Sequence, residues 1–278
     1  MYRIMGVVNV TPDSFSDGGA FLDRDAAVGH GLRLAFEGAE LLDIGGESAR
    51  PGADPVPERD ELARVIPVVE GIRAENAHVR ISIDTSKAAV AAAALDAGAN
   101  YVNDVTALRG DPEMATLVAE RGVDVCLMHM RGTPRTMQAE ARYEDVVEDV
   151  KAFLSERIDV AVAAGIALER IEVDPGIGFA KTVGHNLELL CRLRELTTLG
   201  RPLVLGTSRK SFLGKITGRE TAERMPATLA TVVMGLERGA EVFRVHDVAP
   251  ARDALAVAAA TLARSWPPTT PARTTTTT

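Results

Sequence analysis

The stretch LLDIGGESARPG, residues 41–52, begins like a buried strand and then stops looking like protein core. Leu41, Leu42 and Ile44 form an apolar run that is typical of a β-strand. The run is followed by residues 45–52, GGESARPG, which include glycines, an acid, a hydroxyl, an arginine and a proline. A simple turn does not need this mixture. The same change from an apolar run to a polar loop recurs along the chain, and this recurrence predicts the fold.

Eight short apolar runs rich in β-branched residues alternate with helical patterns. The runs are residues 4–10, 40–44, 80–84, 101–104, 123–128, 171–174, 202–206 and 242–245. The clearest helical patterns are residues 25–36, 59–73, 87–97, 143–164, 186–196, 221–237 and 250–262. Such alternation predicts parallel βαβ units. Eight repeats fit a closed (β/α)8 TIM barrel better than an open doubly wound sheet.

The composition is that of a soluble α/β protein with a single domain. The chain has 278 residues, of which 46% are hydrophobic, and this is enough for a sizeable core. We expect one barrel domain over residues 1–264 and a disordered Pro- and Thr-rich tail over residues 265–278. The net charge of −8 argues against a nucleic-acid partner, which normally shows as a basic face.

Targeting and redox signals point to the cytoplasm. The N-terminus lacks a basic stretch followed by a long apolar run, and no segment approaches 18 uninterrupted apolar residues. We therefore expect no membrane partner. The two cysteines, Cys126 and Cys191, are too few for a disulfide framework, so we expect both to be core residues in a reducing cytoplasm.

Polar side chains follow the predicted strands at their C-terminal ends, where the loops of a barrel converge. The strand N-termini show nothing comparable, so the pattern predicts a site at one mouth of the barrel. Thr85, Asp104 and Asp247 are equally well explained as turn or helix-capping residues. His129 is either a site residue or a core histidine at a strand end. The residues at these strand ends are Asn9, Asp84, Thr85, Asn103, Asp104, His129, Asp174, Ser208, Arg209, Lys210, Ser211, Arg244, His246 and Asp247.

Cations at the strand ends and in the loop of residues 45–52 predict an anionic ligand. Four of them would face one barrel mouth in an acidic protein, which suggests a phosphate or a diphosphate. We interpret Arg209, beside them, as a solvated loop charge. The four cations are Arg50, Lys210, Arg244 and His246.

Asp84, Asn103 and Asp174 form a second group at the ends of β-rich strands. Buried carboxylates need partners, and an amide beside two acids suits a heterocycle that presents N–H and carbonyl groups. The alternative is an internal salt bridge with Lys210 in the unliganded state. Asn9 precedes a loop with Asp13 and Asp17, and an amide oxygen suits Mg²⁺ that keeps most of its waters and binds a phosphate. Taken alone, Asn9 would more often be a turn residue.

Other motif-based functions are not supported. The pairs Gly18-Gly19 and Gly45-Gly46 match neither the dinucleotide fingerprint nor the P-loop spacing. The five histidines form no metal-binding spacing, and no serine has the sequence context of a nucleophile elbow.

Four motifs resemble those of the dihydropteroate synthase family. They occur in order from the first predicted strand onward and are followed by Arg244-Val245-His246, so the resemblance spans nearly the whole barrel. The motifs are Asn9-Val10-Thr11-Pro12-Asp13-Ser14-Phe15-Ser16-Asp17-Gly18-Gly19, Asp43-Ile44-Gly45-Gly46-Glu47-Ser48-Ala49-Arg50-Pro51-Gly52, Asp174-Pro175-Gly176-Ile177-Gly178-Phe179 and Ser208-Arg209-Lys210-Ser211-Phe212.

The resemblance implies the condensation of 6-hydroxymethyl-7,8-dihydropterin diphosphate with 4-aminobenzoate, with Mg²⁺, in a homodimeric sulfonamide target. It implies that Asp84, Asp174 and Lys210 are catalytic. The implied pterin site is Asp84, Asn103, Met128, Asp174, Phe179 and Lys210. The implied diphosphate site is Asn9, Arg50, Arg244 and His246, with Asn9 also on the metal. The implied 4-aminobenzoate pocket is Phe15, Ala49, Pro51 and Ser211.

Ala49 departs from the family pattern, which usually has threonine at this position. Two other functions compete with the synthase interpretation. One is a paralogue that binds pterin without synthase activity, which only Ala49 supports. The other is a folate-dependent methyltransferase domain, which shares the barrel and the pterin acids but does not need the first-loop motif or the diphosphate cations.

Overall fold

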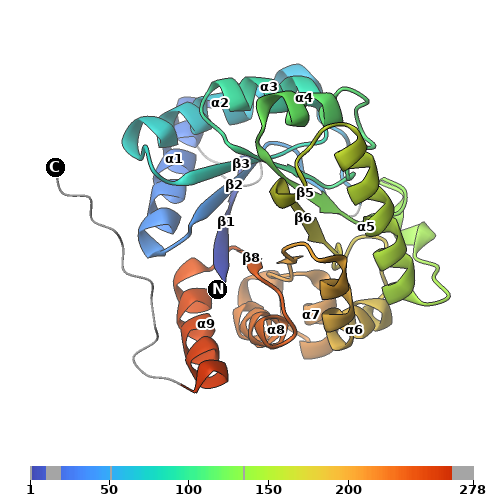
Figure 1. Ribbon diagram of the computed structural model, residues 1–278. Coiled ribbons are helices and arrows are strands. Elements are labelled where there is room, and N and C mark those ends of the chain that lie inside the picture. Colours follow the sequence, from blue (N-terminus) through green and yellow to red (C-terminus); the bar gives the residue numbers. More distant parts are fainter. Residues whose placement is uncertain (1, 11–19, 51, 134, 265–278) are drawn as a thin grey trace.

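Eight parallel strands surround a common axis in the computed structural model, which describes residues 2–10, 20–50, 52–133 and 135–264 (Figure 1). The hydrogen-bonded order is β6-β5-β4-β3-β2-β1-β8-β7, and a parallel bridge between Val173 and Leu203 joins the two ends. The (β/α)8 TIM barrel predicted from the sequence is therefore confirmed. The strands are β1 (Arg3–Asn9), β2 (Leu41–Gly45), β3 (Arg80–Asp84), β4 (Tyr101–Asp104), β5 (Asp124–Met128), β6 (Ile171–Asp174), β7 (Val204–Leu205) and β8 (Val242–Val245).

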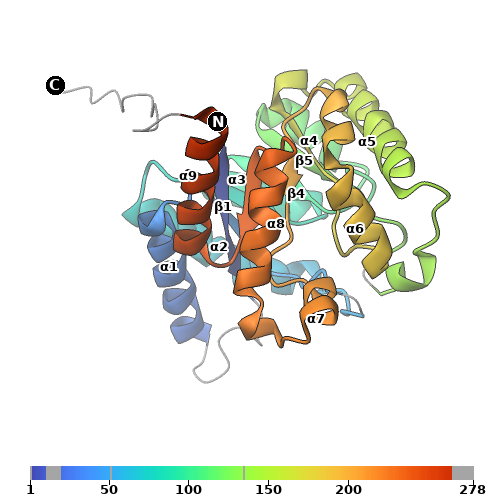
Figure 2. The same cartoon turned by 90° about the horizontal axis from the view of Figure 1, so that it is seen from below.

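Helices form a ring around these strands, as Figures 1 and 2 show from two directions. None of the described helices is long and apolar enough to cross a membrane. The α-helices are α1 (Ala20–Glu37), α2 (Glu58–Glu75), α3 (Ala88–Asp96), α4 (Met114–Arg121), α5 (Val146–Ala163), α6 (Val183–Cys191), α7 (Ser211–Thr217), α8 (Met225–Glu237) and α9 (Val248–Ala263). Short 3-10 helices are η2 (Met137–Glu140), η3 (Leu168–Arg170), η4 (Leu193–Leu199) and η5 (Thr221–Glu223).

The predicted strands are all found, and the differences have local causes. β7 is shortened to Val204–Leu205 within the predicted run 202–206, because Pro202 has no N–H to donate to a ladder. The predicted helix over residues 221–237 is divided into η5 and α8, and Pro226 stands in the first turn of α8, where its missing N–H costs nothing. Helices α4 and α7 were not predicted, since eight and seven residues are too few for a clear helical period.

The barrel interior is built in layers along its axis. Side chains from six strands form one apolar layer: Met5, Leu41, Tyr101, Cys126, Val204 and Val242. Because strand side chains alternate between the two faces, residues two positions further along each strand also face inward. Toward the C-terminal ends of the strands, Asp43, Asn103 and Arg244 form a polar layer in this way, and the apolar Met128 lies beside them. The backbone alternation therefore places the candidate site directly above an apolar floor.

Three further predictions have different outcomes. Cys126 is a core residue as expected, but the prediction for Cys191 is wrong, because its side chain is exposed on α6. The predicted tail over residues 265–278 lies outside the described residues. The extent of the barrel domain, residues 1–264, stays a prediction.

Candidate active site

Arg244 stands at the centre of the polar layer. Its Nε donates to Oδ2 of Asp43 at 2.6 Å, and its Nη2 donates to Oδ2 of Asp84 at 2.8 Å. Asp43 is completely buried and also accepts hydrogen bonds from Ser82 Oγ (2.6 Å) and Asn103 Nδ2 (3.1 Å). Side chains from strands β2, β3, β4 and β8 are thus joined in one hydrogen-bonded network.

Asp174 and Lys210 lie beside this network. Asp174 is 6% exposed, and its Oδ1 accepts a 2.6 Å hydrogen bond from the backbone N–H of Gly176. The Lys210 ammonium donates to the carbonyl of Ile177 and lies 4.7 Å from the centre of the Phe179 ring. A Cβ built on Gly206 would lie 3.7 Å from Asp174 Oδ2 and 3.8 Å from Lys210 Nζ, so both polar groups approach the same glycine.

The close packing of these groups shifts their pKa values. Burial, followed by the neighbouring Asp43 carboxylate, raises the pKa of Asp84 to about 7, although Arg244 opposes this shift. Burial also raises the pKa of Asp174, against the attraction of Lys210. Burial lowers the pKa of Lys210 to about 8, although Asp174 favours its charged form. For Arg244 burial acts to lower the pKa, but Asp43 and Asp84 outweigh it and raise the pKa overall.

Met128 and Phe179 form an apolar wall next to the polar layer. Met128 packs with Met130, Met137 and Ala180, and the half-buried Phe179 lies against this cluster. The loop that carries Phe179 turns sharply at Gly176, where φ is +66° and an added Cβ would lie 1.9 Å from the carbonyl oxygen of His129. Only glycine fits there, and this position brings Phe179 toward Lys210.

The predicted phosphate residues occupy the rim next to Arg244. The Nδ1 atom of His246 lies 3.0 Å from Ser208 Oγ, which also accepts from the His246 backbone N–H at 3.2 Å. Burial and the neighbouring Arg244 lower the pKa of His246 to about 4. Arg50 is exposed in the loop that follows β2, and its charge lowers the pKa of His246 further.

Asn9 ends β1, where its Cα pairs with Gly45 of β2, and its side chain is half-buried. Within the described ranges, no group of three or more His, Cys, Asp and Glu side chains is arranged to hold a metal ion.

The predicted 4-aminobenzoate residues are only partly described. Phe15 and Pro51 lie outside the described residues. Ala49 is half-buried in the loop after β2, and Ser211 is exposed at the first position of α7, directly after Lys210.

The residues that were left with two interpretations are structural. His129 is 2% exposed, its Nδ1 lies 3.0 Å from Lys181 Nζ, and burial lowers its pKa to about 2, so it is a core histidine. Asp104 accepts from the backbone N–H groups of Thr106 and Leu108, both at 2.8 Å, and therefore holds a turn. Thr85 Oγ1 accepts from the backbone N–H of Lys87 just before α3.

Arg209 contradicts the sequence-based interpretation as a solvated loop charge. Its Nη2 and Nε bind both carboxylate oxygens of Asp247 at 2.5 and 3.0 Å. The two residues follow neighbouring strands, β7 and β8, and this pairing across 38 residues has no local sequence signal.

Asp43 is the functional candidate that sequence reasoning missed. It was quoted only as part of a motif, although it bonds Ser82, Asn103 and Arg244. The available signal was a single acid inside the apolar run from Leu41 to Ile44, two residues after an inward-facing leucine.

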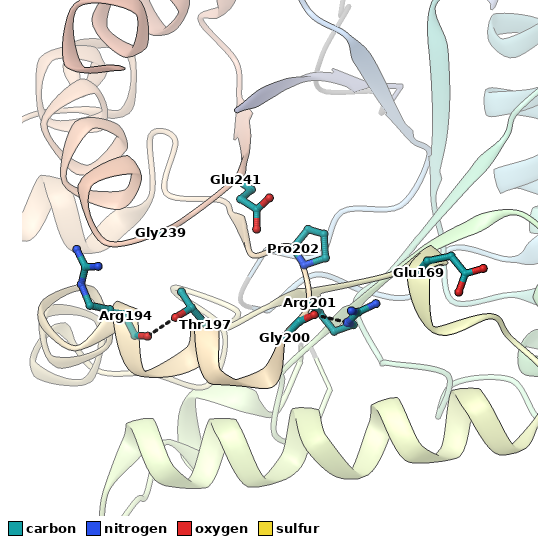
Figure 3. A pocket seen from close by; sticks show the side chains of 8 residues that line it. All are labelled: Glu169, Arg194, Thr197, Gly200, Arg201, Pro202, Gly239 and Glu241. Carbon is teal, nitrogen blue, oxygen red and sulfur yellow. Dashed lines mark hydrogen bonds between the residues drawn. The ribbon is translucent and has the colours of Figure 1, made fainter. Parts of the chain in front are cut away.

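The hollow shown in Figure 3 does not belong to this site. It lies beside the residues that precede strands β6, β7 and β8, at the opposite end of the barrel. Its polar side chains bond backbone carbonyls: Thr197 Oγ1 donates to the carbonyl of Arg194 at 2.8 Å, and Arg201 Nε donates to that of Gly200 at 2.5 Å. Arg194 and Arg201 also donate to the carbonyls of Glu237 and Leu168. The hollow is lined by Glu169, Arg194, Thr197, Gly200, Arg201, Pro202, Gly239 and Glu241.

Comparisons with known proteins place the chain in one enzyme family. The family model described as pterin binding enzyme matches residues 5–246. The chain is 44% identical to the dihydropteroate synthase of Haemophilus influenzae, covering 93% of this chain and 94% of that protein. It is 50% identical to the solved Xanthomonas albilineans dihydropteroate synthase with 4-aminobenzoic acid, with a TM-score of 0.89 over 94% of this chain and 93% of the other. A Yersinia pestis dihydropteroate synthase with a sulfonamide drug complex is 43% identical, with a TM-score of 0.89 over 94% of both chains.

Proposed function

Because the chain belongs to the pterin-binding enzyme family and, within it, to the dihydropteroate synthases, we propose that the residues gathered at the barrel mouth carry out the synthase reaction. The enzyme is a transferase of folate biosynthesis, in a family that is a sulfonamide target. It condenses 6-hydroxymethyl-7,8-dihydropterin diphosphate with 4-aminobenzoate and gives 7,8-dihydropteroate and diphosphate.

The pterin ring binds in the polar layer. Asp174 and Asp84 accept hydrogen bonds from its N–H groups, and Asn103 and Lys210 bond its remaining polar atoms. Met128 and Phe179 cover the ring faces. Support for this assignment comes from hydrogen-bonding capacity that remains at two buried side chains. Among the described residues, Asp174 bonds the Gly176 N–H through Oδ1 and Asn103 bonds Asp43 through Nδ2, so Asp174 Oδ2 and Asn103 Oδ1 can still accept hydrogen bonds from a ligand.

The diphosphate binds at the rim through Arg244, His246 and Arg50. Two donors of the Arg244 guanidinium bond Asp43 and Asp84, and the fork geometry of an arginine leaves further donors for a phosphate oxygen. His246 lies next to Arg244, so the two groups can bind the same anion.

The chemistry follows from where charge develops. As the diphosphate leaves, negative charge grows at the rim and positive charge grows on the methylene carbon, which is conjugated to the electron-rich pterin. Arg50 and Arg244 stabilise the first charge as cations, whereas His246, which the sequence predicted to be a fourth cation, has a pKa lowered to about 4 and acts as a neutral hydrogen-bonding group. The carboxylates of Asp84 and Asp174 stabilise the second one more than they stabilise the neutral substrate, which is differential binding of the transition state. The amine of 4-aminobenzoate is already nucleophilic, so the attack needs no strong base.

We propose Mg²⁺ as the cofactor, held by Asn9 and the diphosphate. The fit rests on the donor set: an amide oxygen is a hard ligand, and Mg²⁺ commonly binds one or two protein groups while keeping several waters and substrate phosphates. When bound, the ion would neutralise charge on the leaving diphosphate.

We propose that the enzyme is a homodimer that uses the face formed by α6, α7 and α8. This face carries three exposed large apolar side chains, namely Leu187 (47% exposed), Ile216 (53%) and Met234 (36%). The three helices pack against one another and form one side of the barrel (Figure 2). Burial of these three side chains against a second copy would remove apolar area from water, which favours association. We also propose a cytoplasmic location, which agrees with two unpaired cysteines.

The observation that carries the proposed site is the network of Asp43, Asp84, Asn103 and Arg244, with Asp174 and Lys210 beside it. The assignment of Asn9 to the metal is tested by calorimetric titration of wild type and Asn9→Ala with the pterin diphosphate, with and without Mg²⁺. The wild type should bind more tightly with Mg²⁺, and Asn9→Ala should lose this gain. A gain that persists in Asn9→Ala would remove Asn9 from the metal site.

The oligomer is tested separately by sedimentation velocity. Leu187→Glu together with Ile216→Glu should give a monomer. Val257→Glu, at an apolar position on α9 that is 70% exposed, should leave the dimer intact. A wild type that sediments as a monomer would contradict the dimer.

A further inference from the structure

Lys87 joins two loops at the rim of the barrel without belonging to the substrate groups above. It immediately precedes α3, close to the end of β3 that carries Asp84. Its Nζ donates to Glu47 Oε2 and to Glu61 Oε2. Glu47 lies in the β2–α2 loop, and Glu61 lies in the first turn of α2. One ammonium group therefore connects the loop after β2, helix α2 and the start of α3.

Glu61 keeps Lys87 in this position. The Glu61 side chain is completely buried, and its Oε1 has no hydrogen-bond partner within the described part of the chain. A buried carboxylate is costly unless a counter-ion compensates it, and Lys87 supplies that charge. Burial alone would lower the pKa of Lys87, but its hydrogen bonds to Glu47 and Glu61 raise the pKa overall. The ammonium therefore stays charged and remains bound to Glu61.

Helix α2 also holds the backbone of the β2–α2 loop one residue before Glu47. Arg64 Nη1 donates to the carbonyl of Gly46 at 2.8 Å. A Cβ built on Gly46 would lie 2.8 Å from Val65 Cγ1 and 3.2 Å from Glu61 Cγ, so the loop backbone packs directly on the helix. The loop is thus fixed at two consecutive residues, first through its backbone and then through the Glu47 side chain. Ala49 and Arg50 follow two and three residues later.

We propose that Glu61, Lys87 and Glu47 are positioning residues of the synthase, which set the place of the β2–α2 loop and so orient Ala49 and Arg50 toward their substrates. This rests on the proposed assignment of Ala49 to 4-aminobenzoate and Arg50 to diphosphate. The three residues act through the loop and not by contact with the pterin group. Glu47 is the informative position, because removing it leaves the buried Glu61–Lys87 pair intact. Variants of Glu61 are less informative, since its charge also raises the pKa of Asp84.

The test compares Glu47→Ala and Glu47→Gln with wild type in steady-state kinetics and in calorimetric titration with the phosphate-free hydroxymethyl pterin. We expect Glu47→Ala to raise the Michaelis constant for 4-aminobenzoate by roughly 3- to 10-fold, which lies between the effects of an exposed ion pair and of a buried charged hydrogen bond. Glu47→Gln retains one acceptor and should fall between Ala and wild type. The affinity for the phosphate-free pterin should change by less than about 2-fold, because its proposed ligands lie on other strands.

Asp124→Ala is the matched control. Asp124 pairs with Arg80 at the opposite end of the barrel, and the side chains of that pair are 25% and 33% exposed, against 26% and 25% for Glu47 and Lys87. This variant should lower stability but leave both Michaelis constants unchanged. Lys87→Arg should retain the wild-type constants better than Lys87→Met.

Two results would overturn the positioning role. One is an unchanged constant for 4-aminobenzoate in Glu47→Ala, and the other is an equal loss of affinity for the phosphate-free pterin. A separate variant tests the assignment of Arg50 to the diphosphate, on which the positioning role rests. If that assignment is wrong, Arg50→Ala will bind the pterin diphosphate as tightly as wild type.

Discussion

The Nη2 atom of Arg244 donates a 2.8 Å hydrogen bond to Oδ2 of Asp84, although the family resemblance implies that the two residues bind different parts of the substrate. The sequence allowed an internal salt bridge in the unliganded site, with Lys210 as the basic partner. The structure contains such a bridge, but Arg244 makes it, with Asp43 as the second acid. The proposed phosphate group and the proposed pterin group are thus coupled before any substrate binds.

Arg244→Gln should weaken the pterin diphosphate far more than the phosphate-free hydroxymethyl pterin. A hydrogen bond to a charged group contributes about 1.5–3 kcal/mol, so the diphosphate should bind roughly 10- to 150-fold more weakly. Calorimetric titration of both ligands measures the difference. Equal losses would mean that Arg244 serves only to neutralise Asp43 and Asp84.

Asp43→Asn should lower the free energy of unfolding by about 3 kcal/mol, because it removes a fully buried partner from the charged Arg244. Ser82→Ala, which removes one hydrogen bond from the same carboxylate, should lower it by only about 1 kcal/mol. Urea denaturation of the three proteins provides the comparison. An Asp43→Asn variant that is more stable than Ser82→Ala would contradict the central role of Asp43.

These two variants also show how far the sequence could predict the site. Strand ends are recognisable because apolar runs stop at polar residues, and Asp84, Asn103, Asp174 and Arg244 were found in this way. Pairing could not be predicted in the same manner, since Arg244 and Asp43 are 201 residues apart and meet only when the barrel closes.

The same limit explains the errors elsewhere. Arg209 was interpreted as a solvated charge because its partner Asp247 comes from the next strand. Cys191 lies in a helical pattern, but the sequence does not show which face of α6 packs against the barrel, so its exposure could not be predicted. By contrast, the strand ranges depend on local composition and were predicted closely, apart from β7, where Pro202 shortens the ladder.

Asp174→Asn should weaken pterin binding strongly and should affect the stability of the fold much less. The side chain lies at the end of β6 with Lys210 nearby, and an amide cannot accept two N–H groups as a carboxylate does. We expect a loss of roughly 10- to 150-fold in affinity for the hydroxymethyl pterin. Near-wild-type affinity in a calorimetric titration would remove Asp174 from the pterin site.

The pH dependence of kcat/KM for the pterin diphosphate should be bell-shaped. Asp84, whose pKa is raised to about 7, must be ionised to accept an N–H group, so the rate constant should rise as the pH increases through 7. Lys210, whose pKa is lowered to about 8, must keep its proton to donate, so the rate constant should fall above 8. Asp84→Asn should remove the acidic limb from the remaining activity and leave the basic one. If the acidic limb of the pH profile persists in Asp84→Asn, a group other than Asp84 causes it.

Ala49→Thr should lower the Michaelis constant for 4-aminobenzoate by roughly 2- to 12-fold. Threonine adds a hydroxyl donor and a methyl group at a half-buried loop position, and a net hydrogen bond contributes about 0.5–1.5 kcal/mol. The constant for the pterin diphosphate should hardly change, because the proposed pterin ligands lie on other strands. If Ser48 or Ser211 already supplies the donor, the 4-aminobenzoate constant will stay the same, and Ala49 is then a tolerated variation of the loop.

Formation of 7,8-dihydropteroate by the purified protein tests the account most directly. Wild type incubated with the pterin diphosphate, 4-aminobenzoate and Mg²⁺ should turn over repeatedly, and Asp174→Asn under the same conditions should form product at a rate at least roughly 10-fold lower. A wild type that binds both substrates but forms no dihydropteroate, or an Asp174→Asn variant that matches it in rate, would contradict the account.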